Sequence, residues 1–169
     1  MTDRGVPAVM EPLDRRITAS LARLGPTVAR IALGVVFFWF GVLKFFPDLS
    51  PAQDLAARTI ERLTLGVVGP SLSLPVLATW ETLIGLGLLT GRFLRATLFL
   101  LAVQMIGTFL PLVFFPDETF MRFPFVPTLE GQYIIKNVVL ITAAMVVGAT
   151  VRGGRMVAEP PRGTAEEGR

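Results

Sequence analysis

Residues 80–92 read WETLIGLGLLTGR, an apolar run with regular glycines whose second residue, Glu81, is a carboxylate. The run belongs to a longer apolar stretch from about Leu74 to Thr90. A helix of roughly 17–25 residues crosses a hydrocarbon layer about 30 Å thick, because each residue adds about 1.5 Å. This stretch is therefore long enough to span a membrane, with an ionisable group inside it.

Three further apolar runs of similar length occur, at about Pro26–Phe46, Phe93–Phe115 and Tyr133–Val151. The whole chain of 169 residues is 52% hydrophobic and only 17% charged, with a mean hydropathy of +0.62. A soluble domain of this size needs more polar surface than that. The sequence therefore predicts an all-α integral membrane protein, a four-helix bundle formed by residues 26–151.

Two shorter segments have the spacing of amphipathic helices. One lies in residues 1–25 and is expected to rest on the inner membrane surface; the other lies in the first outer loop and is expected to cap the bundle. Their apolar positions are Leu13, Ile17, Leu21 and Leu24 in the first, and Ala56, Ile60, Leu63 and Val67 in the second. Residues 152–169 are rich in Pro, Gly and Glu, which predicts a disordered cytoplasmic tail.

The arginines indicate the orientation of the spans. They gather before the first run, in the turn between the second and third runs, and after the fourth run, whereas the third-to-fourth connection is mainly acidic. Because loops rich in Lys and Arg face the cytoplasm, both termini are expected to be cytoplasmic. Arg58 and Arg62 in the first outer loop oppose this assignment, although acidic residues accompany them.

The absence of cysteine and histidine limits the chemistry of this chain. It cannot form a disulfide, a thiol relay, a histidine-ligated haem or a zinc site of the usual kind. We therefore expect no metal site, and no cofactor built from the chain itself. The net charge of +3 is small, and the arginines flank apolar runs, so nucleic acid is not an expected partner.

Counting 1.5 Å per residue from the arginines at the inner boundary gives the depth of each polar group. Glu81 lies about 16 Å beyond Arg92, near the midplane, and Gln104 lies at about 13–14 Å by the same count. Lys44 and Lys136 lie farther toward the outside. A lone charge at the helix centre costs about 2.5–3.5 kcal/mol, so Glu81 is expected to face inward and to be paired.

Simpler interpretations remain open for each of these groups. Lys44 either pairs with Glu81 or extends to the headgroups. Arg30 is expected to be an inner anchor whose side chain extends to the headgroups. Gln104 is more often an interhelical hydrogen bond than a ligand. A Glu81–lysine pair can also serve only to fix the packing of the helices.

Three segments resemble the DoxX-like superfamily of four-helix membrane proteins, and the third is most similar to its YkgB/RclC-type branch. They are RIALGVVFFWFGVLKFFP, ETLIGLGLLTGR and PTLEGQYIIKN, in that order along the chain. The resemblance singles out Lys44, Glu81, Gly85, Glu130, Tyr133, Lys136 and Asn137. It implies a place in the bacterial inner membrane and a connection to redox or oxidative-stress chemistry, with membrane or membrane-associated redox proteins, or further copies of the chain, as partners.

Three functions are compatible with these observations, and none identifies a reaction that the chain would catalyse. The first is an accessory subunit of a redox system that binds a quinone or another lipophilic ligand. Its site would be the intramembrane Glu/Lys cluster, which comprises Glu81, Lys136, Lys44, Asn137, Gln104, Tyr133 and Glu130. The second is a proton-coupled transporter of small solutes, and the third is a catalytically silent anchor for partner proteins.

Overall fold

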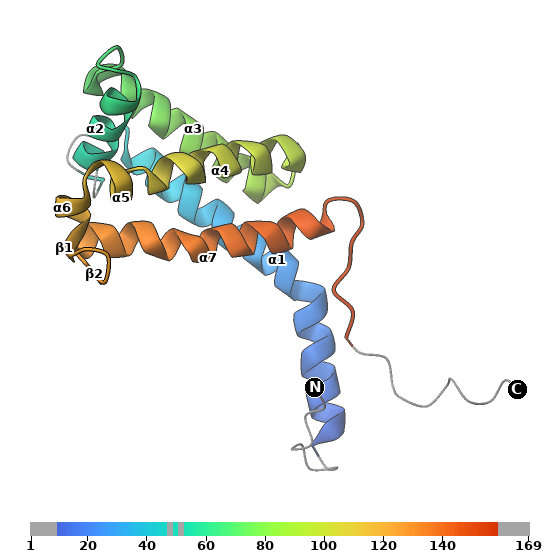
Figure 1. Cartoon of the computed structure of the whole chain (residues 1–169). Helices are drawn as coiled ribbons and strands as arrows, with labels where there is room; N and C mark the ends of the chain where they lie inside the picture. Colours follow the sequence, from blue (N-terminus) through green and yellow to red (C-terminus); the bar gives the residue numbers. More distant parts are fainter. Residues whose placement is uncertain (1–9, 47–48, 51–52, 159–169) are drawn as a thin grey trace, which may run out of the picture.

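The computed structural model describes residues 10–46, 49–50 and 53–158. Two short antiparallel strands lie between α6 and α7 and were not predicted; the rest of the regular structure is helical, which confirms the all-α class. Figure 1 shows the elements, which are α1 (Glu11–Leu43), α2 (Gln53–Leu63), α3 (Pro70–Thr90), α4 (Leu94–Phe109), α5 (Pro111–Phe114), α6 (Pro116–Thr119), β1 (Phe120–Arg122), β2 (Val126–Pro127) and α7 (Leu129–Thr150).

Within the described residues, four helical segments are long and apolar enough to cross a membrane. No more than 28% of the residues in the apolar window of each segment are buried inside the protein, so most of the apolar surface is left to contact lipid. The chain is therefore a multi-pass membrane protein. The four segments are Glu11–Leu43, Pro70–Thr90, Leu94–Phe114 and Leu129–Thr150.

The four long helices form a closed ring. Helices α1 and α4 each pack against both α3 and α7, and the most extensive of these interfaces joins α1 to α3. The apolar core lies where the four helices meet, and it comprises Leu33, Phe37, Ile84, Leu88, Leu101, Met105 and Val147.

Glycines bring α1 and α3 into close contact. A Cβ atom on Gly85 would collide with the backbone of Phe38, and one on Gly41 would lie 2.6 Å from the backbone nitrogen of Thr82. Small residues let helix backbones approach closely in a bilayer, where packing replaces the hydrophobic effect as the attraction between helices. The close approach beside Gly85 fixes which α1 residues lie beside Glu81.

The first helix is longer than predicted. Instead of a surface helix followed by a separate span, α1 is continuous from Glu11 to Leu43 and contains Pro26. Figure 1 shows that its first part runs across the direction of α7, whereas its second part joins the bundle. Proline removes one helical hydrogen bond and bends a helix, which accounts for a change of direction within one continuous element.

The first outer loop contains the predicted capping helix, α2. It lies with α5, α6 and the β1–β2 hairpin at the end of the bundle opposite the N-terminal part of α1 (Figure 1). Residues 152–158 of the predicted tail follow α7 without helix, and the remaining tail residues, like residues 1–9, lie outside the described residues.

Candidate functional site: the Glu81 cluster

Glu81 lies near the middle of α3 and is 8% exposed. The helix presents this position to α1, because Gly85 one turn later packs directly against α1. Helix α4 packs against α3 as well. Two side chains from those helices bind the carboxylate, one on each oxygen. We call Lys44, Glu81 and Gln104 the Glu81 cluster.

Lys44 supplies the cation. It is the first residue after the end of α1, and its Nζ lies 2.7 Å from Glu81 Oε2. The Lys44 side chain is 12% exposed, so the ammonium points inward to the acid instead of outward to the headgroups. Its flexible stem bridges the difference in depth between the two residues, and it also approaches the Phe40 carbonyl at 3.5 Å.

Gln104 supplies the second donor. It lies on α4, and its Nε2 donates to Glu81 Oε1 at 3.0 Å. Both carboxylate oxygens are therefore bound by protein groups from two different helices. Breaking a buried ion pair by removing one partner typically costs about 3–5 kcal/mol, so this cluster also holds α1, α3 and α4 together.

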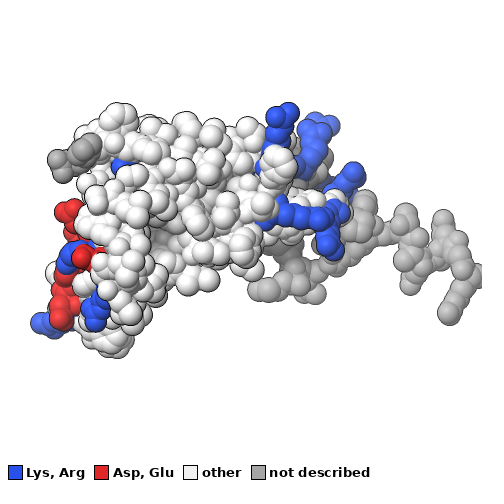
Figure 2. All heavy atoms as spheres, turned by 90° about the horizontal axis from the view of Figure 1, so that it is seen from above, with Lys and Arg blue, Asp and Glu red and all other residues white. Residues whose placement is uncertain are grey.

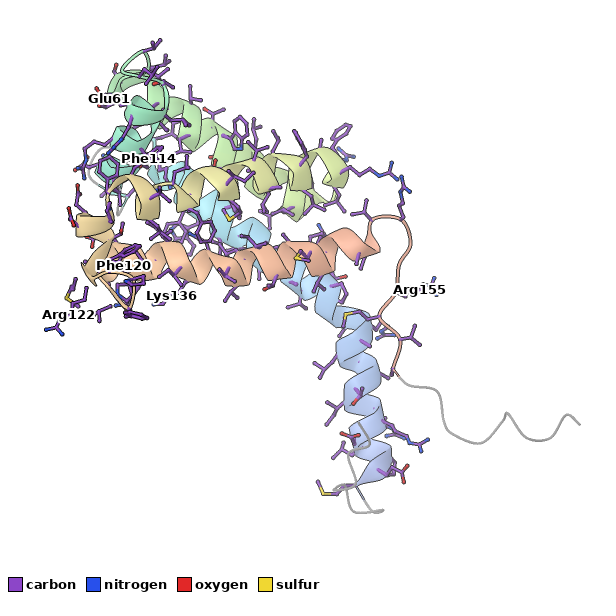
Figure 3. All side chains as sticks on the ribbon, in the orientation of Figure 1. Glu61, Phe114, Phe120, Arg122, Lys136 and Arg155 are labelled. Atoms are coloured by element: carbon purple, nitrogen blue, oxygen red, sulfur yellow. The ribbon has the colours of Figure 1, made fainter. Side chains whose placement is uncertain are left out.

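The predicted residues of α7 do not join the cluster. Lys136 is exposed, and Figure 3 shows it on the side of α7 away from the other helices. Its Nζ lies 5.8 Å from the ring centroid of Tyr133. Tyr133 is itself 56% exposed, and Asn137 is half-buried. The reason is the rotation of α7: its buried residue Ile134 faces the bundle, and a residue two positions later lies about 200° around the helix.

Glu130 lies at the end of the bundle that α2 caps, away from the Glu81 cluster. It lines a polar cavity of about 530 Å³ between α2, α6 and the start of α7. The residues around this cavity are Ser50, Gln53, Asp54, Leu55, Arg58, Glu118 and Glu130. No group of three or more metal-ligating side chains occurs among the residues that the structure describes.

Arg58 and Arg62 hold together the cap of the bundle, which is formed by α2, α5 and α6. Arg58 donates to both oxygens of Glu118, at 2.7 and 2.5 Å, and Arg62 donates to the Phe114 carbonyl at 2.7 Å. Both guanidinium groups also lie over the Phe115 ring. The hydrogen bond from Arg58 lowers the pKa of Glu118, and the same bond raises the pKa of Arg58. These contacts give the two arginines that opposed the predicted orientation a structural role in the cap.

Arg30 has a role that the sequence did not reveal. We expected an inner anchor extending to the headgroups, but its Nη1 donates to the carbonyl of Leu88 and, at 3.2 Å, to that of Leu89. These carbonyls belong to the last turn of α3, where they lack partners within the helix. Gly91 follows in the left-handed conformation, with φ of 69°, and leaves space for the guanidinium. The sequence signal for this contact is an arginine, Arg30, near the inner end of one predicted span and a glycine, Gly91, just after the inner end of the next.

The family model described as DoxX matches residues 25–115, more than half of the chain. The protein belongs to the DoxX family. A comparison with curated proteins gives no match, and a comparison with solved structures gives none either. All three residues of the Glu81 cluster lie within the DoxX match, whereas Glu130, Tyr133, Lys136 and Asn137 lie beyond its end.

Proposed function

We propose that this DoxX protein is an accessory membrane subunit of a redox or oxidative-stress system, and that the Glu81 cluster binds the polar head of a lipophilic ligand of the quinone class. The observation that carries the proposal is a buried carboxylate held by an ammonium and an amide between three membrane-spanning helices. An ionisable group at this depth is expensive to maintain and is a functional-site candidate for that reason.

The hydrogen-bonding capacity of the cluster suits such a head. An ammonium group has three N–H donors, and Lys44 uses one on Glu81 and one, at 3.5 Å, on Phe40. Among the described residues, no donor is bonded to the side-chain oxygen of Gln104. One N–H donor of Lys44 and the side-chain oxygen of Gln104 are thus left beside the Glu81 carboxylate. A quinone carbonyl accepts hydrogen bonds and a quinol hydroxyl donates them, so both redox forms find partners here.

A shallow apolar groove lies on the exposed side of α3, turned away from Glu81, where a lipid chain can contact the helix. It has a volume of about 320 Å³ and lies on α3, lined by Pro75, Val76, Thr79, Trp80 and Leu83. Trp80 immediately precedes Glu81, and its Nε1 donates to the Leu100 carbonyl of α4 at 3.2 Å.

The composition of the chain limits which electron carriers the proposal allows. With no cysteine in the chain, electrons must be carried by the bound quinone or by the cofactor of a partner redox protein.

We further propose that the protein lies in a bacterial inner membrane with both termini in the cytoplasm, because the arginine-rich end of the molecule contains the N-terminal part of α1 and the residues after α7.

A second candidate is a membrane anchor whose polar core only fixes the packing of the helices. One observation favours it: no buried side-chain nitrogen or oxygen of the described residues lacks a hydrogen-bond partner. The fully buried atoms of the cluster are all bonded within the protein, so they do not require a ligand. The two candidates differ in whether the remaining donor of Lys44 and the side-chain oxygen of Gln104 bind a ligand.

Extraction of the purified protein with organic solvent, followed by chromatography and mass spectrometry, tests the proposal. We expect quinone to accompany the wild type and the Lys136→Met variant, and to be lost from Lys44→Met and Glu81→Gln. Lys136→Met is the matched control, because the chain has only two lysines and Lys136 lies outside the cluster. Folded wild-type protein that carries no quinone, and that binds none added to it, would support the anchor.

A further inference from the structure

The first part of α1 is exposed on nearly all sides. Its apolar stripe, at Leu13, Ile17, Leu21 and Leu24, has side chains that are 50–65% exposed. An exposed stripe of this kind on a helix needs a partner surface, since water is a poor environment for it. The spacing of three and four residues places the whole stripe on one side of the helix.

The position of this segment indicates which surface covers the stripe. The segment continues directly into the membrane-spanning part of α1, so its C-terminal end lies at the bilayer surface. It then runs across the direction of α7, and hence along the surface of the bilayer instead of away from it (Figure 1). A helix in this position contacts lipid along its length without any partner protein.

The charges favour an anionic lipid surface. Arg16 and Arg23 are seven residues apart and share one flank of the stripe, and no acceptor among the described residues is bonded to either. On the face seen in Figure 2, the charged side chains at the end of the bundle where α7 finishes are all basic, while the acidic side chains lie at the opposite end together with other basic ones. Arginines at the edge of an apolar stripe lie at the depth of the lipid phosphates.

We propose that residues 11–25 form an in-plane helix that binds anionic phospholipid headgroups, with the apolar stripe among the acyl chains and Arg16 and Arg23 on the phosphates. The turn between α3 and α4, the first turn of α4 and the segment after α7 add arginines to the same surface, namely Arg92, Arg95, Arg152 and Arg155. The helix thereby fixes the depth of the first span. This inference is independent of any ligand at the Glu81 cluster.

The depth of the helix can be measured with single spin labels, because the chain has no native cysteine. Ile17→Cys places a label in the stripe, and Ala19→Cys places a matched label about 200° around the helix. In vesicles of phosphatidylcholine with phosphatidylglycerol, we expect the first label to collide mainly with oxygen and the second with a water-soluble nickel chelate. Equal access of both labels to nickel would show a helix projecting into water, and shielding of the first label from both reagents would show a protein partner. Either result overturns the proposal.

The preference for anionic lipid is tested by native mass spectrometry of the detergent-solubilised full chain titrated with phosphatidylglycerol or phosphatidylcholine. An arginine near an anionic surface contributes about a fivefold gain in affinity, so Arg16→Gln combined with Arg23→Gln should weaken phosphatidylglycerol binding by about 25-fold. Arg122→Gln, at the opposite end of the molecule, is the matched control and should bind like the wild type (Figure 3). Equal binding of the two lipids by the wild type, or equal behaviour of the double variant and the control, would overturn the proposal.

Discussion

Replacing Lys44 by methionine should destabilise the bundle strongly. The change leaves the Glu81 carboxylate, which is 8% exposed, without its cation at 2.7 Å. Removing one partner of a buried pair typically costs about 3–5 kcal/mol. Removing the neutral donor should cost less: interhelical hydrogen bonds in membranes average about 0.6 kcal/mol and reach about 1.7, so Gln104→Leu is expected in that range.

A second substitution tests whether the loss comes from the unpaired charge. Combining Lys44→Met with Glu81→Gln removes both charges and keeps a polar group opposite Gln104. We expect the double variant to recover most of the stability that Lys44→Met loses. Non-additivity of this kind is the signature of two residues in direct contact.

The assay is reversible unfolding in mixed micelles, followed by the loss of helical circular dichroism. Lys136→Met is the matched control and should unfold with nearly the wild-type free energy, because Lys136 is exposed on α7. Equal destabilisation by Lys44→Met and Lys136→Met would refute the assignment of Lys44 as the partner of Glu81. Additive losses in the double variant would refute the ion pair.

Three further predictions address other parts of the fold. Gly85→Ala should destabilise by about 1–3 kcal/mol in the same unfolding assay, because its Cβ would meet the backbone of α1, whereas Gly107→Ala, which has open space, should cause no loss. Arg30→Leu should cost about 1.5–3 kcal/mol, since it removes charged hydrogen bonds to the end of α3, and Arg30→Lys should restore part of it. The ion pair of the cap should depend on pH: the pKa of Glu118 is lowered in the fold, so its contribution is complete above the ordinary value of 4.5 and is lost as the pH falls through the lower folded value. Unfolding temperatures measured from neutral pH to below 4.5 should show this loss in the wild type and not in Glu118→Gln; identical profiles would contradict it.

The membrane spans and the inward-facing acid were predictable because they depend on local features of the sequence. An apolar run of sufficient length must span a bilayer, and a carboxylate near its centre must turn toward protein. Counting from the boundary arginines placed Glu81 and Gln104 at similar depth. In the structure, Gln104 Nε2 lies 3.0 Å from Glu81 Oε1.

The choice between the two lysines was not predictable, because it depends on how far α7 is rotated about its axis. Packing of Ile134 and Val147 sets that rotation and turns Lys136 away from the bundle. A helix that is apolar on nearly all sides has little periodicity from which a buried face can be read. Lys44, by contrast, follows the last turn of a helix whose glycines already fix its orientation toward α3.

The continuous first helix and the cap depend on tertiary context as well. Pro26 is a reasonable boundary between two helices, yet here the helix continues through it. The cap is formed by contacts between residues more than 50 positions apart, such as Arg58 with Glu118 and Arg62 with the Phe114 carbonyl. No local pattern predicts pairs of this separation.

The central claim is that Lys44, and not Lys136, binds the Glu81 carboxylate within the membrane. Solid-state NMR in lipid tests it directly, because the chain has two lysines and ¹⁵N-lysine labelling therefore gives two ammonium signals. With ¹³C-labelled glutamate carboxylates, we predict that one ammonium signal is strongly dephased by a nearby carboxylate carbon. That signal should persist in Lys136→Met and vanish in Lys44→Met. Dephasing of neither signal, or of the Lys136 signal alone, would contradict the account.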